Sequence, residues 1–330
     1  MKIAIFTITK DAQDVAFNLK KVLDEDSTVI KVGIFHKNVK ETLKYVFRDY
    51  DCIIGIMATG IMVRNICGLI RDKIEDPAVL VMDDQAKHVI SLLSGHFGGA
   101  NEITLKIAEI SGADPVITTA TDIHGKIGID SLARRYHLEI DDPKKIMTIN
   151  SALVNNKTPD LYVPSKFEFI FNDPLIKNSY NLLKFENKDL KAVFEDTEIV
   201  LKPKKLVVGI GARKAVLQLD VKSAVESAIN ALNLSLDRID MLATAEVKKN
   251  EVGIIETAMK LDIPLEIISL DKLKDFKDPQ CAKSLFVEGK FGIPGVCEPS
   301  ALIAAGNNSK LIFRKTAFNG VTIAVAVSSN

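Results

Sequence analysis

The sequence predicts an α/β protein of layered sheets with flanking helices, in which a small middle module separates two major domains. Short apolar runs alternate with amphipathic runs up to about residue 140, which is typical of a layered α/β sheet. The composition changes after Asp141, and the alternation resumes from Leu206. A chain of 330 residues also exceeds the usual size of one core. We therefore expect domains at residues 1–140, 141–203 and 204–330.

Apolar spacing predicts the elements of the N-terminal domain. In the first helix, Ala12, Val15 and Leu19 recur on one face. Gly112 is expected to end the third helix. The predicted strands are 2–7, 51–57, 78–82, 88–93 and 115–118, and the predicted helices are 11–23, 61–69 and 100–110.

The middle module is less periodic than the domains on either side. It is rich in Lys, Asn and Asp, and Pro143 after two aspartates indicates a helix start. Short strands are expected at 167–171, 192–194 and 199–201. In the C-terminal domain the predicted strands are 206–210, 239–243 and 265–269, and the predicted helices are 221–232, 252–261 and 298–305. Asn319-Gly320 between apolar runs predicts a closing hairpin of 310–316 and 321–327.

Charge and composition exclude several classes of function. The 43 basic and 43 acidic side chains give zero net charge, so we expect no nucleic-acid partner. Since no apolar stretch approaches the roughly 18 residues of a membrane span, we expect no membrane partner. The cysteines and histidines show neither CxxC nor HxxxH spacing. We therefore expect a cytoplasmic protein with reduced cysteines, no bound metal and no cofactor.

Two loops of the N-terminal domain share one pattern, in which a buried strand runs into a glycine-bearing loop and then a helix. The first contains Thr59 and Gly60, and the second runs from Ser94 to Glu102. Helix N-termini present unpaired N–H groups that suit anionic ligands. However, such turns also occur for steric reasons, and neither matches a dinucleotide or P-loop fingerprint.

His96 is the candidate general base, because a neutral imidazole accepts protons near pH 7. The alternative is a role in positioning substrate. Ser94 is a candidate for substrate binding and a weaker one for a nucleophile, since a pair two residues apart in one loop rarely has the required geometry. Asn101 and Glu102, on the first turn of the following helix, are candidates for substrate binding.

Further polar residues are candidates for substrate binding, each with a structural alternative. Thr119, Thr121 and Asp122 follow a strand and are expected to face the same crevice, or else to cap the next turn. Arg64 and Lys73 could meet acidic substrate groups or form a solvated helix face.

In the C-terminal domain, Gly211 and Arg213 are compatible with an anion-binding turn. Glu298 is either a charge favoured by the helix dipole or a second acid/base group.

Several blocks of sequence resemble the CbiG family, the cobalt-precorrin-5A hydrolases. SGHFGGAN and PVITTATDIHGK resemble the N-terminal domain of that family, and VVGIGARK, ATAEVKKNEVGI and GVCEPSALIAAG resemble its second domain. The resemblance covers most of the chain and leaves out the middle module. Family members commonly carry Cys and then Arg after the GIG turn, where this chain has Ala212 and Arg213. The resemblance therefore does not imply a functional thiol at position 212 of this chain.

The resemblance implies hydrolysis of a δ-lactone on a cobalt-bearing tetrapyrrole, with release of acetaldehyde, in the ring contraction of cobalamin biosynthesis. The cobalt then belongs to the substrate. Such a reaction needs a base, donors for the ester oxyanion and anchors for the carboxylates of the substrate. His96 suits the base, and the N–H groups of Gly98 and Gly99 suit the oxyanion. The basic side chains and the Thr59-Gly60 turn suit the anchors.

Two alternatives to this hydrolase are kept. One is a non-catalytic protein that binds or passes on corrinoid intermediates, for which the same loops would serve. The other is a nucleotide-binding oxidoreductase, which the missing fingerprint disfavours. A homodimer is compatible with a two-domain enzyme of this size.

Overall fold

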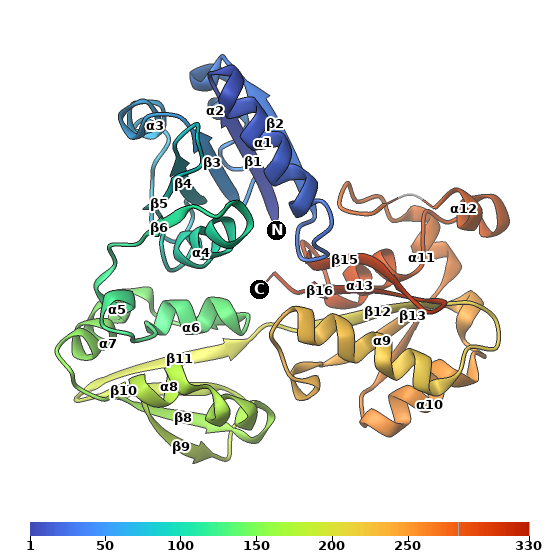
Figure 1. The fold of residues 1–330 in the computed structure, drawn as a ribbon. Coiled ribbons are helices and arrows are strands. Elements are labelled where there is room, and N and C mark those ends of the chain that lie inside the picture. The colour runs from blue at the N-terminus through green and yellow to red at the C-terminus, as the bar shows by residue number, and fades with distance from the viewer. Residues whose placement is uncertain (283, 330) are drawn as a thin grey trace. The chain divides into compact units, whose positions relative to one another are not determined.

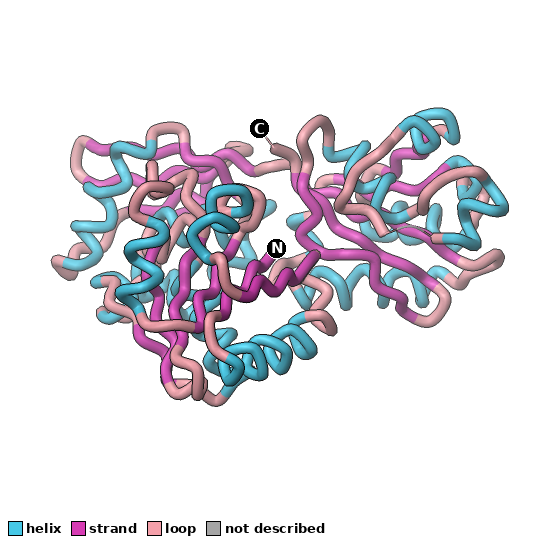
Figure 2. The backbone as a smooth tube through the Cα atoms, turned by 90° about the horizontal axis from the view of Figure 1, so that it is seen from above, coloured by secondary structure: helices cyan, strands magenta, loops and turns pink. Residues whose placement is uncertain are grey.

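The computed structural model describes residues 1–282 and 284–329, and it confirms the predicted mixed α/β fold. The chain forms two compact units, residues 1–202 and residues 203–330. The first unit contains two sheets and the second contains one. Within each unit the helices lie beside the strands (Figure 1; Figure 2). The division of the chain into three domains stays a prediction. No helix in the described ranges is long and apolar enough to cross a membrane.

The first sheet has six strands in the order β2-β1-β3-β4-β5-β6, with helices on both faces. Alternate residues of β1 separate the two faces. Ile3 and Ile5 pack with the first and fourth helices of the unit, whereas Ala4 and Phe6 pack with the second and third. The strands are β1 (Lys2–Thr7), β2 (Lys31–His36), β3 (Cys52–Ile56), β4 (Ala78–Met82), β5 (His88–Leu93) and β6 (Asp114–Val116). The helices are α1 (Lys10–Leu23), α2 (Val39–Val46), α3 (Thr59–Ile66) and α4 (Ala100–Ser111).

A hairpin between β4 and β5 reverses the direction of this sheet. Strands β1 to β4 are parallel, β5 is antiparallel to β4, and β6 is parallel to β5. The Asp83 carboxylate stabilises the turn by accepting hydrogen bonds from the backbone N–H groups of Gln85, Lys87 and His88. Loops that follow β5 and β6 therefore lie at the opposite edge of the sheet from loops that follow β1 to β4.

The second sheet, also in the first unit, has the order β7-β11-β10-β8-β9. The predicted strands 192–194 and 199–201 are confirmed within β10 and β11. The predicted strand 167–171 is wrong, because Phe167 and Ile170 are buried at the three-residue spacing of the 3₁₀ helix η2. The strands are β7 (Leu138–Ile140), β8 (Asp160–Pro164), β9 (Asn181–Phe185), β10 (Leu190–Phe194) and β11 (Thr197–Pro203). The helices around them are α5 (Ala120–Ile123), α6 (Ile129–Arg135), η1 (Pro143–Lys145), α7 (Ile146–Val154), η2 (Ser165–Asn172) and α8 (Pro174–Ser179).

The second unit is built on a sheet of order β14-β13-β12-β16-β15. The predicted closing hairpin is confirmed, with Asn319 and Gly320 both at positive φ in its turn. Its strands are β12 (Leu206–Ala212), β13 (Met241–Ala245), β14 (Leu265–Ile268), β15 (Lys310–Phe318) and β16 (Val321–Val327). Its helices are α9 (Gln218–Ala231), η3 (Leu236–Arg238), η4 (Glu246–Lys248), α10 (Val252–Leu261), α11 (Leu270–Asp275), α12 (Leu285–Phe291) and α13 (Cys297–Ala305).

Candidate functional site

His96 lies in the loop after β5, and its imidazole is held between two carboxylates. Its Nδ1 is 3.1 Å from Oδ2 of Asp130, and its Nε2 is 3.1 Å from Oδ2 of Asp122. The hydroxyl of Thr121 is 3.0 Å from the same Nε2. Asp122 belongs to α5, and Asp130 belongs to the first turn of α6. The site is thus assembled from one loop and two short helices of the first unit (Figure 1).

Asn101 joins the loop after β5 to the loop after β6. Its side chain is almost fully buried, and its Nδ2 donates to Thr119 Oγ1 and Asp122 Oδ2, both at 3.0 Å. Its Oδ1 accepts a hydrogen bond of 2.7 Å from Ser91 on β5. The expected proximity of the two loops is confirmed, because parallel neighbouring strands end at the same edge of a sheet. Thr119 precedes α5 without a side-chain capping bond, so the capping alternative does not describe it.

The two carboxylates determine the charge of His96. Burial by itself lowers the pKa of the imidazole, but the hydrogen bonds and negative charges of Asp122 and Asp130 outweigh burial and raise it to about 9. For Asp130, burial raises the pKa, but the hydrogen bond and charge of His96 outweigh it and lower the pKa below the usual range. His96 is therefore mainly an imidazolium at neutral pH. This charge state opposes the predicted role of general base, which needs the neutral ring.

The glycine turn is shaped for packing. The N–H of Gly99 donates to the carbonyl oxygen of His96 at 3.0 Å, so it is engaged and is not a free oxyanion donor in this conformation, whereas the oxyanion role of the Gly98 N–H stays a prediction. Gly99 has a φ of +79°, and a Cβ there would overlap the guanidinium of Arg134. A Cβ on Gly98 would lie within 2.6 Å of the Ser94 Cβ. Gly98 is thus required by close contacts with Ser94 and the Ala78 backbone, and Gly99 is favoured by its positive φ.

The Ser94 hydroxyl has the surroundings of a structural group. Ser94 adopts a positive φ of 57°, and its Oγ is buried without a hydrogen-bond partner among the described residues. The His96 nitrogens face Asp122 and Asp130 instead. Ser94 and His96 therefore form no hydrogen-bonded pair, in agreement with the prediction that Ser94 is a weak candidate for a nucleophile.

Glu102, predicted to bind substrate, pairs with two arginines of α6. It forms an ion pair with Arg134, and its Oε1 is 3.6 Å from Nε of Arg135. Arg134 therefore places a positive charge beside the His96 loop. Sequence reasoning missed both Arg134 and Asp130. Asp130 follows Gly128-Ile129 at a helix start and has only the pattern of an ordinary first-turn acid.

The loop after β3 does not belong to this site, contrary to the expectation from sequence. Thr59 and Gly60 follow a strand that runs opposite to β5, so they lie at the other edge of the sheet. Arg64 is exposed and bonds the Gly60 carbonyl oxygen at 3.3 Å, and Lys73 is also exposed. Both basic side chains are therefore exposed to solvent, as in the second of the two roles predicted for them.

The predicted residues of the second unit are mainly structural. Gly211 lies inside β12 opposite Thr322, so the predicted anion-binding turn does not begin there. The backbone N–H of Arg213 donates to the Gly320 carbonyl oxygen. Glu298 is 3% exposed and lies in the first turn of α13. The helix dipole favours a negative charge at this position, which agrees with the first of the two roles predicted for Glu298. Its two carboxylate oxygens accept backbone N–H bonds from Ala282 and Lys315, at 2.8 and 2.9 Å.

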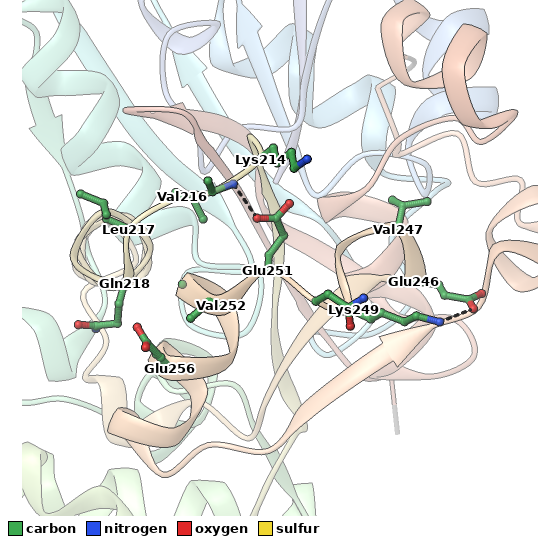
Figure 3. A pocket seen from close by; sticks show the side chains of 13 residues that line it. Lys214, Val216, Leu217, Gln218, Glu246, Val247, Lys249, Glu251, Val252 and Glu256 are labelled. Carbon is green, nitrogen blue, oxygen red and sulfur yellow. Dashed lines mark hydrogen bonds and ion pairs between the residues drawn. The ribbon is translucent and has the colours of Figure 1, made fainter.

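A hollow of about 680 Å³ lies in the second unit, beside the N-terminal ends of α9 and α10. Glu251 accepts a hydrogen bond of 2.9 Å from the N–H of Ala215 at this hollow, and Lys249 lies 3.4 Å from Glu246 (Figure 3). None of the candidate site residues lines it, but two of the blocks that resemble the family do: VVGIGARK supplies Lys214, and ATAEVKKNEVGI supplies residues 246, 247 and 249–253. It is lined by residues 214–218, 246, 247, 249–253 and 256.

The arrangement around His96 can carry acid–base chemistry on an uncharged or anionic substrate. It combines a cationic ring, two carboxylates and three polar side chains within hydrogen-bonding distance. The side chain of Asp122 is 36% exposed, whereas that of Asp130 is 6% exposed. A ligand therefore has access to Asp122 and not to Asp130.

Two family models match the chain. Residues 41–122 match the description "Cobalamin synthesis G N-terminal", and residues 206–326 match "Cobalamin synthesis G C-terminus". The first match includes the strands β3 to β6 and both glycine loops. It also includes His96 and Asp122, whereas Asp130 follows it.

Two curated relatives and one solved structure are similar to the chain along its whole length. The probable cobalt-precorrin-5A hydrolase of Methanocaldococcus jannaschii is 34% identical and aligns over 100% of both chains. The cobalt-precorrin-5A hydrolase of Priestia megaterium is 28% identical over 98% of this chain and 94% of its own. A cobalamin biosynthesis protein G homolog from Sulfolobus solfataricus has a TM-score of 0.65 at 28% identity, covering 99% of this chain and 97% of that structure.

Proposed function

This chain belongs to the cobalamin synthesis G family, and we propose that it is a cobalt-precorrin-5A hydrolase whose reaction takes place at the His96 cluster. It opens the δ-lactone of the substrate with water, and acetaldehyde is released as the macrocycle contracts. Curated relatives that carry this activity in their names align with nearly the whole chain, which supports the assignment. The cobalt is part of the substrate, and the enzyme uses no cofactor of its own.

The observation that carries the location of the reaction is the His96 network. Lactone hydrolysis moves one proton from water and returns one proton to the departing ester oxygen. The cluster holds a protonated imidazole next to an accessible carboxylate, with Nε2 and Oδ2 3.1 Å apart. Groups that accept and donate protons in one place typically contribute about 10²–10⁴ in rate. No other residues singled out from the sequence are joined into such a network.

Arg134 anchors one of the substrate carboxylates in this proposal. It takes the anchoring role predicted for Arg64, which follows β3 at the other edge of the sheet, and for Lys73, which is exposed. The guanidinium packs against Gly99 and is paired with Glu102, whose side chain is 43% exposed. A substrate carboxylate would take over a position beside this guanidinium, since a planar guanidinium suits bidentate recognition of carboxylates.

One experiment separates the hydrolase from a protein that only binds or passes on corrinoids. Purified protein is given the lactone-bearing cobalt intermediate, and released acetaldehyde is coupled to an aldehyde dehydrogenase. We expect acetaldehyde in proportion to enzyme, together with addition of one water to the lactone seen by mass spectrometry. Tight binding of the intermediate without either product would establish the carrier alternative instead. The cytoplasmic location and a homodimer stay predictions.

A further inference from the structure

The two carboxylates on His96 are not equivalent, and the difference indicates which of them meets substrate. Asp130 is buried, and its second oxygen is also occupied, because Oδ1 accepts bonds from Asn150 Nδ2 at 3.0 Å and from the Ser131 N–H at 3.1 Å. Asp130 is thus fixed by the protein on both oxygens. Asp130 can therefore act on a reacting group only through the imidazole of His96.

Asp122 has one occupied oxygen and one open oxygen. Its Oδ2 faces His96 Nε2 at 3.1 Å, Asn101 Nδ2 at 3.0 Å and Thr121 Oγ1 at 3.4 Å. Among the described residues none is recorded as a partner of Oδ1. Three groups contact Oδ2 while the side chain as a whole is 36% exposed, which favours Oδ1 as the oxygen that is open to solvent. The three contacts on Oδ2 therefore hold the carboxylate so that Oδ1 faces a ligand that enters from solvent.

The charges of the cluster support a proton-accepting role for that open oxygen. One imidazolium faces two carboxylates, so the three groups carry one net negative charge. Asp122 can take up a proton while Asp130 keeps His96 paired. A buried ion pair that persists through the reaction avoids leaving an uncompensated charge in the site.

We propose that Asp122 is the general base of this hydrolase, that its Oδ1 takes the proton of the attacking water, and that His96 and Asp130 are positioning residues. This inference rests on the proposed function. The water oxygen bonds to the lactone carbonyl carbon as its proton passes to Oδ1. The ring C–O bond then breaks, and Asp122 returns the proton to the departing alkoxide oxygen. One water is added across the ester, and the base is regenerated.

The test compares Asp122→Asn with Asp114→Asn, an exposed aspartate at the start of β6 outside the network. Lactone opening is followed in a single turnover, with substrate affinity and thermal unfolding measured for each variant. We expect Asp122→Asn to lose at least about 10² in rate while it still binds the intermediate and stays folded at the assay temperature, with a lower free energy of unfolding because the His96 imidazolium loses one of its two carboxylate partners. Asp114→Asn should keep the wild-type rate. An Asp122→Asn rate within about threefold of wild type would overturn the proposal.

Rescue distinguishes a base from a structural carboxylate. Adding formate to Asp122→Ala supplies a small carboxylate in the space of the lost one, and we expect it to restore the rate at least about tenfold. Asp130→Asn should not be rescued, and its pH–rate profile should move because the imidazole loses one of its two negative partners. Failure of formate to restore any activity would overturn the assignment of Asp122. Wild-type protein without activity would instead contradict the proposed function itself.

Discussion

The loop after β3 and the loop after β5 look alike in sequence, yet the structure gives them different surroundings. Each follows a strand, carries glycine and opens a helix, although β3 is buried throughout and β5 only in part. The β5 loop is tied to α4, α5 and α6 through His96, Asn101 and their carboxylate partners. In the described part of the chain, the side-chain hydrogen bonds of α3 stay within that helix, as from Arg64 to Gly60, although the backbone N–H of Met57 donates to the Met82 carbonyl oxygen on β4. Two loops with the same local sequence pattern therefore do not form equivalent sites, because a site also needs side chains from other elements.

The largest expected difference between the loops is in catalysis. His96→Ala should keep the fold and tetrapyrrole binding but lose at least about 10² in rate, since Asp122 loses the group that orients it. Arg64→Ala should stay within about twofold, because its side chain is solvated and bonds only its own helix. Acetaldehyde release and substrate affinity are measured for both. Equal losses in the two variants would contradict the separation of the loops.

Replacing the glycine of each loop with alanine should change the free energy of unfolding by different amounts. Gly99→Ala forces a side chain into positive φ and against Arg134, so we expect the free energy of unfolding to fall by about 1–3 kcal/mol. Gly60→Ala meets only the Arg64 Nη1 at an ordinary 3.5 Å and should change it by less than about 0.5 kcal/mol. Urea unfolding of both variants gives the comparison. A Gly99→Ala protein as stable as Gly60→Ala would show that the Arg134 contact is not present in solution.

The charge of His96 predicts a pH dependence that the β3 loop lacks. Its pKa of about 9 in the folded protein lies above the ordinary 6.5. The ion pairs therefore stabilise the fold fully below about pH 6.5, and this stabilisation is lost as the pH rises through about 9. Asp130 contributes in the opposite direction at acid pH, since its pKa is lowered.

The measurement is an NMR titration of the His96 ring together with unfolding free energies across pH 6.5 to 9. Asp130→Asn should shift the titration toward lower pH, and His96→Gln should remove this part of the slope. A ring that titrates near 6.5 in the wild type would contradict the two-carboxylate arrangement.

The smallest effect is expected within the β5 loop itself. Ser94→Ala removes a buried hydroxyl that has no hydrogen-bond partner among the described residues, so no bond is lost. We expect the rate to stay within about threefold of wild type and the stability to change little. Acetaldehyde release from the variant checks this. A loss as large as that of His96→Ala would restore the serine nucleophile as a candidate.

The order of most elements could be read from the sequence because it depends on local pattern. Alternating apolar runs predicted most strands of the first and third sheets, and Asn319-Gly320 predicted the closing hairpin. The blocks around His96 and Thr121 also pointed to the family, and their parallel strands brought them together. The segment around Phe167 was misread as a strand because a short apolar run lacks a period long enough to separate a strand from a 3₁₀ turn.

The sequence by itself determined the alternation of strands and helices, the glycine loops and the residue types of the site. The tertiary structure alone decided which loops share an edge, since the reversal at Asp83 separates Gly60 from His96. It also decided the charge of His96, because Asp130 approaches from a helix 34 residues further along the chain. Strand direction and long-range pairing depend on hydrogen bonds between distant segments, which no local pattern of residues contains.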